Sequence, residues 1–314
     1  MTSGQVASVY AFCGKSPEQC GMNQLTAKVN SMADKISEVT DHVSANDGTQ
    51  LFFRHHRVEN EKAGILIVHG IGEHSGRYRR LTEVLNADGA SVFSYDHRGH
   101  GLSAGKRGHV DRFQDYINDL ELMMDKFRSA LSSQVPFFLL GHSMGGLIVL
   151  NYAQQGGEQV DGVIVSAPGL KAAIKPPGAK ILAARVMSVL APSFSFDNEL
   201  DPTLLSHDEK AVDAYVNDPL VHRQITARWG IEFMKTAEHT LKDAPLLKTP
   251  VLMQVAGDDR LVSPEACRVF FQNVSSEDKT LRFYDSLYHE IYNENEDLRK
   301  PVISDLQSWL NDHV

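Results

Sequence analysis

Short, largely apolar runs recur along this 314-residue chain, and a segment whose apolar residues have helical spacing follows almost every one. Runs of this kind are typical of strands that are buried on both faces of a parallel sheet. Strand–helix alternation on this scale predicts a layered α/β fold with a mainly parallel sheet. The expected strands are 50–58, 64–68, 90–95, 137–140, 162–166, 251–255 and 280–284, and the expected helices are 79–87, 114–131, one beginning near 145, 264–272 and 301–310.

The alternation is interrupted between residues 169 and 244. A stretch of this length is too long for a loop of a compact domain, so we expect an inserted subdomain. Its residues 179–191 (AKILAARVMSVLA) are strongly apolar and helical in pattern, and two more helical stretches follow. We therefore predict a core formed by residues 44–168 and 245–314, interrupted by a cap subdomain at 169–244.

A separate pattern precedes the core, in residues 1–43, where we expect a flexible leader followed by a helix. The helix is predicted by one apolar stripe. Its residues recur at spacings of 4, 3, 4 and 3 and are Leu25, Val29, Met32, Ile36 and Val39. We expect this amphipathic helix to pack on the domain surface, with a dimer contact as the alternative.

Charge, cysteine content and hydropathy exclude several classes of protein. The chain has 31 Lys and Arg residues against 40 Asp and Glu, a net charge of −9 with neutral histidines, so we expect no nucleic-acid partner. Three cysteines without a CxxC pair favour neither a disulfide scaffold nor a cysteine-based zinc site. Because neither a signal-peptide core nor about 18 consecutive apolar residues occurs, we expect a cytoplasmic protein whose membrane contact is peripheral.

The motif G-x-S-x-G stands at residues 141–145, directly after one expected strand and directly before an expected helix. In this context the motif forms a sharp turn that strains the backbone of the serine and admits only glycine beside it. The hydroxyl of Ser143 would then project at the carboxyl edge of the sheet, near the first amides of the helix. An incidental serine in a glycine-rich turn is the weaker interpretation.

A serine hydroxyl needs a base that takes its proton and an acid that orients the base. In this architecture the three residues occur in the order serine, acid, histidine, and the last two follow later strands. Asp258 and Asp259 follow the strand 251–255, and His289 follows the strand 280–284. We predict His289 as the base, and the spacing leaves the acid open between the two aspartates.

The oxyanion of a tetrahedral intermediate needs two amide donors. One prediction is the backbone N–H of Met144, which follows the nucleophile. The second is the N–H of Ile71, in the loop HGIG (69–72) directly after an early strand. The glycines of this loop let its backbone approach a substrate.

Three longer motifs are more specific than the serine motif alone. They are HGIGEHSGRY at 69–78, DHRGHGLS at 96–103 and GHSMGG at 141–146. Together they resemble the monoacylglycerol lipase and lysophospholipase branch of the α/β-hydrolases, from about residue 43 to the C-terminus. The resemblance implies the α/β-hydrolase fold, with a mainly parallel central sheet flanked by helices and an inserted helical cap.

The same resemblance implies roles for single residues. In that family the acid precedes Arg-Leu or Arg-Val, which selects Asp259, and the histidine follows an aromatic residue, as His289 does. The second oxyanion donor falls on Ile71, where the family often has a smaller residue, and this departure bears on the shape of the pocket. No cofactor and no metal are implied, because ester hydrolysis by a triad needs none.

The resemblance also suggests contacts for a glycerol-like head group, namely Glu73, Arg77, His142 and, in the cap, Tyr215. For Glu73 and Arg77 the alternative is a buried ion pair that holds the oxyanion loop.

Together these features predict a serine hydrolase that cleaves carboxylic esters of lipids, above all monoacylglycerols, through an acyl-enzyme on Ser143. A lysophospholipase or a short-chain carboxylesterase would use the same triad. An acyltransferase would pass the acyl group to an alcohol, and a hydrolase-fold binding protein should lack a triad member. The apolar segment 179–191 suggests a lid helix that borders an acyl channel and contacts a membrane or micelle. A helix buried on the core is the alternative.

Overall fold

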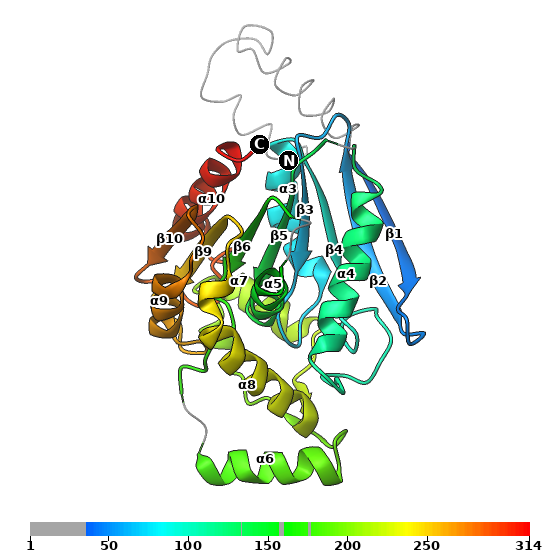
Figure 1. Ribbon diagram of the computed structural model, residues 1–314, viewed down its shortest axis with the longest axis vertical. Helices are drawn as coiled ribbons and strands as arrows, with labels where there is room; N and C mark the ends of the chain where they lie inside the picture. The colour runs from blue at the N-terminus through cyan, green and yellow to red at the C-terminus, as the bar shows by residue number, and fades with distance from the viewer. Residues whose placement is uncertain (1–35, 133, 157–159, 175–176) are drawn as a thin grey trace, which may run out of the picture. The chain divides into compact units, whose positions relative to one another are not determined.

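The computed structural model describes residues 36–132, 134–156, 160–174 and 177–314, and an eight-stranded sheet lies at its centre (Figure 1). The strands of this sheet are β1 (Ile36–Ser44), β2 (Gln50–Val58), β3 (Ala63–Val68), β4 (Ala90–Tyr95), β5 (Phe137–His142), β6 (Gly162–Ser166), β9 (Val251–Ala256) and β10 (Lys279–Tyr284). Their order is β1-β2-β4-β3-β5-β6-β9-β10. Every neighbouring pair from β4 to β10 is parallel, and β2 pairs with β4 antiparallel. The predicted layered fold with a mainly parallel sheet is confirmed.

Helices cover both faces of this sheet. They are α3 (Arg79–Ala87), α4 (Gln114–Arg128), α5 (Met144–Gln154), α9 (Pro264–Asn273) and α10 (Glu296–Asn311). The apolar side chains of α3 and α10 pack into one core cluster, and those of α4, α5 and α9 pack into another. All residues of β3, β4, β5, β6 and β9 are buried, as expected of strands covered on both sides.

The prediction of an amphipathic helix before the core is wrong at its carboxyl end. Ile36 and Val39 lie in β1, which is an edge strand of the sheet. Residues 36–44 are rich in β-branched side chains, and pairing along a sheet edge outweighs a short helical periodicity. The other positions of the stripe, Leu25, Val29 and Met32, lie outside the described residues.

The last helix also begins earlier than Pro301, which the sequence suggested as its first residue. Helix α10 starts at Glu296, and the side chain of Asn295 caps it by accepting the amide of Leu298 at 3.2 Å. A capping asparagine followed by acidic residues is a stronger start signal than the proline.

Residues 169–244, which we call the cap segment, join β6 to β9. They contain α6 (Gly178–Leu190), β7 (Ser195–Asp197), η2 (Pro202–Leu204), α7 (Glu209–Asn217), β8 (Gln224–Thr226) and α8 (Ala227–Lys242). Helix α8 packs against both α5 and α6, and α6 lies beyond α8, far from the sheet (Figure 1). The short antiparallel pair β7–β8 has too few residues to produce a periodic signal in the sequence. The helices that the sequence indicated here are present.

Candidate active site

Ser143 lies at the turn between β5 and α5, at a positive φ of 52° and a ψ of −116°. This conformation is strained for a residue with a side chain, so the surroundings must hold it. Gly145 shows how tight the turn is, because a Cβ there would collide with the carbonyl oxygens of Val68 and His69. The strained strand-to-helix turn that the motif predicts is therefore present.

Asp259 and His289 form a buried pair. The Nδ1 atom of His289 lies 2.6 Å from Oδ2 of Asp259. The other carboxylate oxygen accepts the amides of Leu261 and Val262, at 2.8 and 2.9 Å, and this fixes its orientation. Asp258, by contrast, has 44% of its side chain exposed. The geometry favours Asp259 as the residue that orients the imidazole.

The two histidines near Ser143, His289 and His142, differ in their affinity for a proton. Burial acts to lower the pKa of His289, but the charges of Asp259 and, beyond it, Glu290 and Glu73 outweigh this and raise it. Burial, together with the neighbouring His289, lowers the pKa of His142 to about 3. The centroids of the two rings lie 4.8 Å apart. Only His289 is thus suited to accept a proton near neutral pH.

This difference predicts an acid limb in the pH dependence of kcat/KM. A base must be unprotonated to accept the proton of Ser143, so the rate should fall as the pH drops through the raised pKa of His289. The midpoint should lie above the ordinary histidine value of about 6.5. Initial rates on a short soluble ester, from acidic to mildly alkaline pH, measure it, and a midpoint below the ordinary value would contradict this account.

The oxyanion loop, residues 70–78, lies against Ser143. A Cβ built on Gly70 would come within 2.9 Å of Oε1 of Glu73 and 3.2 Å of the Cβ of Ser143, so a side chain there would crowd both residues. Among the described residues, neither the amide of Ile71 nor that of Met144 donates a hydrogen bond to another group of the chain. Both predicted donors are therefore free to bind a substrate oxygen.

Glu73 and Arg77 form a buried ion pair at 2.7 Å inside this loop. The Oε1 atom of Glu73 also accepts the amide of Gly70 at 2.6 Å and the hydroxyl of Tyr78 at 2.8 Å. Arg77 in turn donates two hydrogen bonds, of 2.6 and 2.7 Å, to the carboxylate of Glu290. The ion pair that we predicted as the alternative for Glu73 and Arg77 is confirmed, and head-group contact stays a prediction.

Glu73, Arg77 and Glu290 form a buried cluster of charges, and we did not predict that Glu290 belongs to it. Glu290 follows His289 directly, but its partner Arg77 is 213 residues away in the sequence, so no local spacing reveals the contact. Burial acts to raise the pKa of the Glu73 carboxyl and of the Glu290 carboxyl. For Glu73 burial outweighs the charge of Arg77, so the pKa is raised. For Glu290 the charge of Arg77 and its two hydrogen bonds outweigh burial and lower the pKa to about 2. Through Arg77, the cluster therefore joins the loop after β10 that carries His289, which we call the histidine loop, to the oxyanion loop.

The two remaining predicted contacts, Tyr215 and His142, lie in the same neighbourhood. The ring of Tyr215, on α7, covers the guanidinium of Arg77 at 4.7 Å. Its buried hydroxyl has no hydrogen-bond partner in the described part of the chain. The Nδ1 atom of His142 lies 3.2 Å from the hydroxyl of Ser166. Contact of either residue with a substrate stays a prediction.

A second buried carboxylate, Glu294, ties the cap segment to the histidine loop. It accepts the amide of Tyr288 at 3.0 Å on one side. On the other it accepts the amide of His207 at 2.8 Å and the hydroxyl of Ser206 at 3.1 Å. The sequence does not predict this tie, because Ser206 and His207 belong to the inserted segment and lie more than 80 residues from Glu294.

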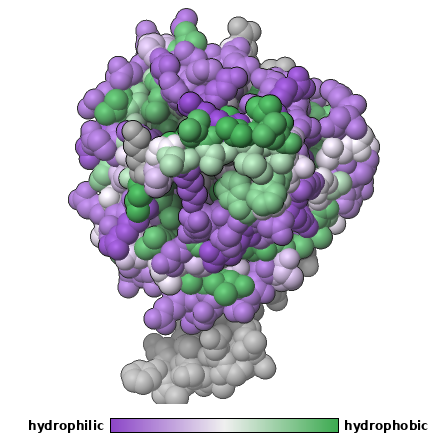
Figure 2. Space-filling model, turned by 90° about the horizontal axis from the view of Figure 1, so that it is seen from below, coloured by the Kyte–Doolittle hydropathy of each residue, from purple (hydrophilic) through white to green (hydrophobic). Residues whose placement is uncertain are grey.

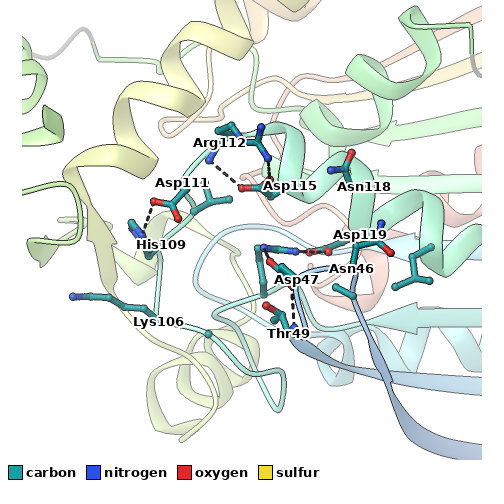
Figure 3. Close-up of a pocket in the computed structure, with 15 residues that line it drawn as sticks. Asn46, Asp47, Thr49, Lys106, His109, Asp111, Arg112, Asp115, Asn118 and Asp119 are labelled. Atoms are coloured by element: carbon teal, nitrogen blue, oxygen red, sulfur yellow. Dashed lines mark hydrogen bonds and ion pairs between the residues drawn. The ribbon is translucent and has the colours of Figure 1, made fainter.

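A polar pocket of about 570 Å³ lies elsewhere, beside the β1–β2 turn and the start of α4 (Figure 3). Within it, Arg98 contacts Asp47 and Asp119 at 2.7 and 2.6 Å, and Arg112 contacts Asp115 at 3.2 Å. Neither Ser143 nor its predicted partners line this pocket. These arginine charges are thus neutralised within the protein.

Within the described residues, no group of three or more His, Cys, Asp or Glu side chains is arranged to hold a metal ion. No helix in the same ranges has both the length and the apolar character needed to cross a membrane.

Comparisons with known proteins identify the family. Residues 59–296 match the hydrolase family described as serine aminopeptidase, S33. The chain is 35% identical over 260 residues to phospholipase YtpA of Bacillus subtilis, covering 82% of this chain and 98% of that protein. It is 32% identical over 278 residues to the monoglyceride lipase of Rattus norvegicus, covering 87% and 90%.

A solved structure agrees with these relatives. The crystal structure of Paleococcus ferrophilus monoacylglycerol lipase is 32% identical and has a TM-score of 0.75, over 89% of this chain and 99% of that one. The family match spans most of the core and all of the cap segment. This chain therefore belongs to the serine aminopeptidase S33 family of α/β-hydrolases, in the branch that includes the monoglyceride lipases.

Proposed function

We propose that this protein hydrolyses carboxylic esters of lipids, above all monoacylglycerols, to a fatty acid and an alcohol. The observation that carries the proposal is the buried His289–Asp259 pair, 2.6 Å apart, in a fold that also strains the backbone at Ser143. Such a triad activates a serine without a cofactor. Relatives named phospholipase and monoglyceride lipase support a lipid ester as the substrate.

The reaction proceeds through an acyl-enzyme. The hydroxyl oxygen of Ser143 attacks the acyl carbon while Nε2 of His289 accepts its proton, and Asp259 stabilises the resulting imidazolium. The amides of Ile71 and Met144 donate to the oxyanion. His289 then gives the proton to the departing alcohol, and later takes one from the water that releases the fatty acid.

The cap segment supports a lipid as the substrate, and contact with a membrane or micelle during catalysis. In α6 only Ser188 is buried, so the alternative of a helix buried on the core is wrong. Apolar side chains gather on the surface at this end of the molecule (Figure 2). The exposed ones on α6 are Leu182, Val186, Val189 and Leu190, at 63%, 49%, 73% and 76%. An apolar helix face of this kind is typical of a surface that meets lipid.

We expect the double substitution Leu182→Ser and Val189→Ser to weaken action on aggregated lipid. The two residues are seven positions apart, on one face of α6. Removing two side chains that insert into lipid should lower the rate on monoacylglycerol vesicles about tenfold and leave the rate on a short soluble ester unchanged. Val269→Ser, on α9 and 46% exposed, is the control. If the double variant and the control acted on monoacylglycerol vesicles at equal rates, α6 would not face lipid.

The proposed substrate is tested with a matched panel on the wild type. It contains p-nitrophenyl esters of increasing chain length, a long-chain monoacylglycerol and a lysophosphatidylcholine. The highest kcat/KM on the monoacylglycerol supports the proposal. The highest value on the lysophospholipid would favour the second candidate, a lysophospholipase, which the similarity to a phospholipase supports. Turnover of short esters alone would leave a short-chain carboxylesterase, and transfer to an added alcohol in preference to water would indicate an acyltransferase.

A further inference from the structure

Asp218 of the cap segment binds the oxyanion loop through His74. The Nε2 atom of His74 lies 2.9 Å from Oδ2 of Asp218. The amide of Gly76 donates to Nδ1 of the same ring at 3.2 Å, so the neutral ring carries its proton on Nε2 and donates it to Asp218. The other oxygen of Asp218 accepts the amide of Leu220 at 2.8 Å, which holds the carboxylate in this orientation.

Two more contacts reach the same loop from residues 215–222. The amide of His222 donates to the carbonyl of Gly72 at 2.9 Å, one residue beyond Ile71. The ring of Tyr215 covers Arg77 at 4.7 Å. We call these three contacts the cap brace. Tyr215 is 3% exposed, so its ring also keeps water away from the ion pairs of Arg77.

The loop is also held from within and by the core. Glu73, a residue of the loop itself, accepts the amide of Gly70 at 2.6 Å, and Asp96 of the core accepts the amide of Ser75 at 2.8 Å. Between these points the loop passes through Ile71 and Gly72, where the hydrogen bond from the cap segment holds the backbone. The position of the Ile71 amide therefore depends on the cap as well as on the core.

We propose that Asp218 and Tyr215 are positioning residues that brace the oxyanion loop from the cap and so hold the amide of Ile71 in place. This inference rests on the proposed function, in which Ile71 donates to the oxyanion. Residues 215–222 then control the chemical step for every ester, whatever its acyl chain. A cap that only encloses the acyl chain would affect long substrates alone.

The test compares Asp218→Ala with Asp218→Asn on p-nitrophenyl acetate, which carries no acyl chain to reach the cap, and on a long-chain p-nitrophenyl ester. We expect Asp218→Ala to lower kcat about tenfold on both esters with KM for the acetate unchanged, because small displacements of a donor weaken oxyanion stabilisation strongly. Asparagine keeps an acceptor for His74 and should restore most of kcat. Asp213→Ala, an exposed aspartate of α7, is the control for loss of charge.

A second variant, Tyr215→Leu, removes the aromatic ring over Arg77 and should lower kcat for the acetate in the same way. If thermal unfolding shows that Asp218→Ala does not fold, Tyr215→Leu tests the brace in its place. Wild-type kcat on the acetate in a folded variant, or an effect confined to KM of the long ester, would overturn the brace. If the wild type itself shows no Ser143-dependent turnover of either ester, the proposed function fails first and the brace falls with it.

Discussion

Replacing Ser143 with alanine is expected to lower kcat for ester hydrolysis by about 10⁵-fold, to the level that the oxyanion donors and binding alone can supply. Without the hydroxyl no acyl-enzyme forms, so the burst of alcohol that precedes steady turnover should disappear as well. Alanine fits the space of serine at the turn between β5 and α5 and keeps its β-carbon, so the strained turn at φ 52° should persist.

The measurement is steady-state and burst kinetics on a p-nitrophenyl ester, with thermal unfolding as the control for folding. The midpoint of unfolding should stay within a few degrees of the wild type, because the substitution changes no buried apolar contact. Residual activity within about tenfold of the wild type in the folded variant would show that another residue carries the reaction.

The second large effect is expected for Asp259→Asn, which should lower kcat by about 10⁴-fold. The amides of Leu261 and Val262 bind one carboxylate oxygen and would hold the carbonyl oxygen of the asparagine there. The NH₂ group would then face Nδ1 of His289, so that Nδ1 must accept and Nε2 carries the proton. In this tautomer the imidazole cannot take the proton of Ser143.

The neighbouring Asp258→Asn is the matched control. It makes the same chemical change one residue away, on a side chain that is 44% exposed and pairs with Arg260 at 3.2 Å near the surface. We expect kcat close to that of the wild type, since exposed ion pairs contribute little. If Asp258→Asn were the more damaging of the two, the assignment of the acid would be wrong.

The fold was predictable from sequence where one short pattern decides a structure. The apolar run of β3 is typical of a strand in a covered sheet, and the limits of β3 and β4 agree with the sequence to within a residue. Prediction failed at Ile36 and Val39, where the helical stripe is outweighed by strand-forming residues and an available sheet edge. Three-residue strands such as β7 carry no periodicity at all.

The candidate site, too, was predictable from the sequence only in part. Ser143, Asp259 and His289 follow predictable strand ends, and chain order indicates their roles. Glu290 and Asp218 were missed because their partners lie 213 and 144 residues away, and only the folded chain brings them together. Motifs therefore reveal the residues proposed for the chemistry, whereas the contacts that hold them in place depend on long-range packing.

Covalent labelling shows whether Ser143 is the nucleophile. The folded protein is treated with a fluorophosphonate, which transfers a phosphonyl group to an activated serine with loss of fluoride, and the adduct is located by peptide mass spectrometry. We expect one adduct per chain, on Ser143, and much slower labelling in Asp259→Asn. Labelling of a different serine, or none in the folded wild type, would show that Ser143 is not the nucleophile.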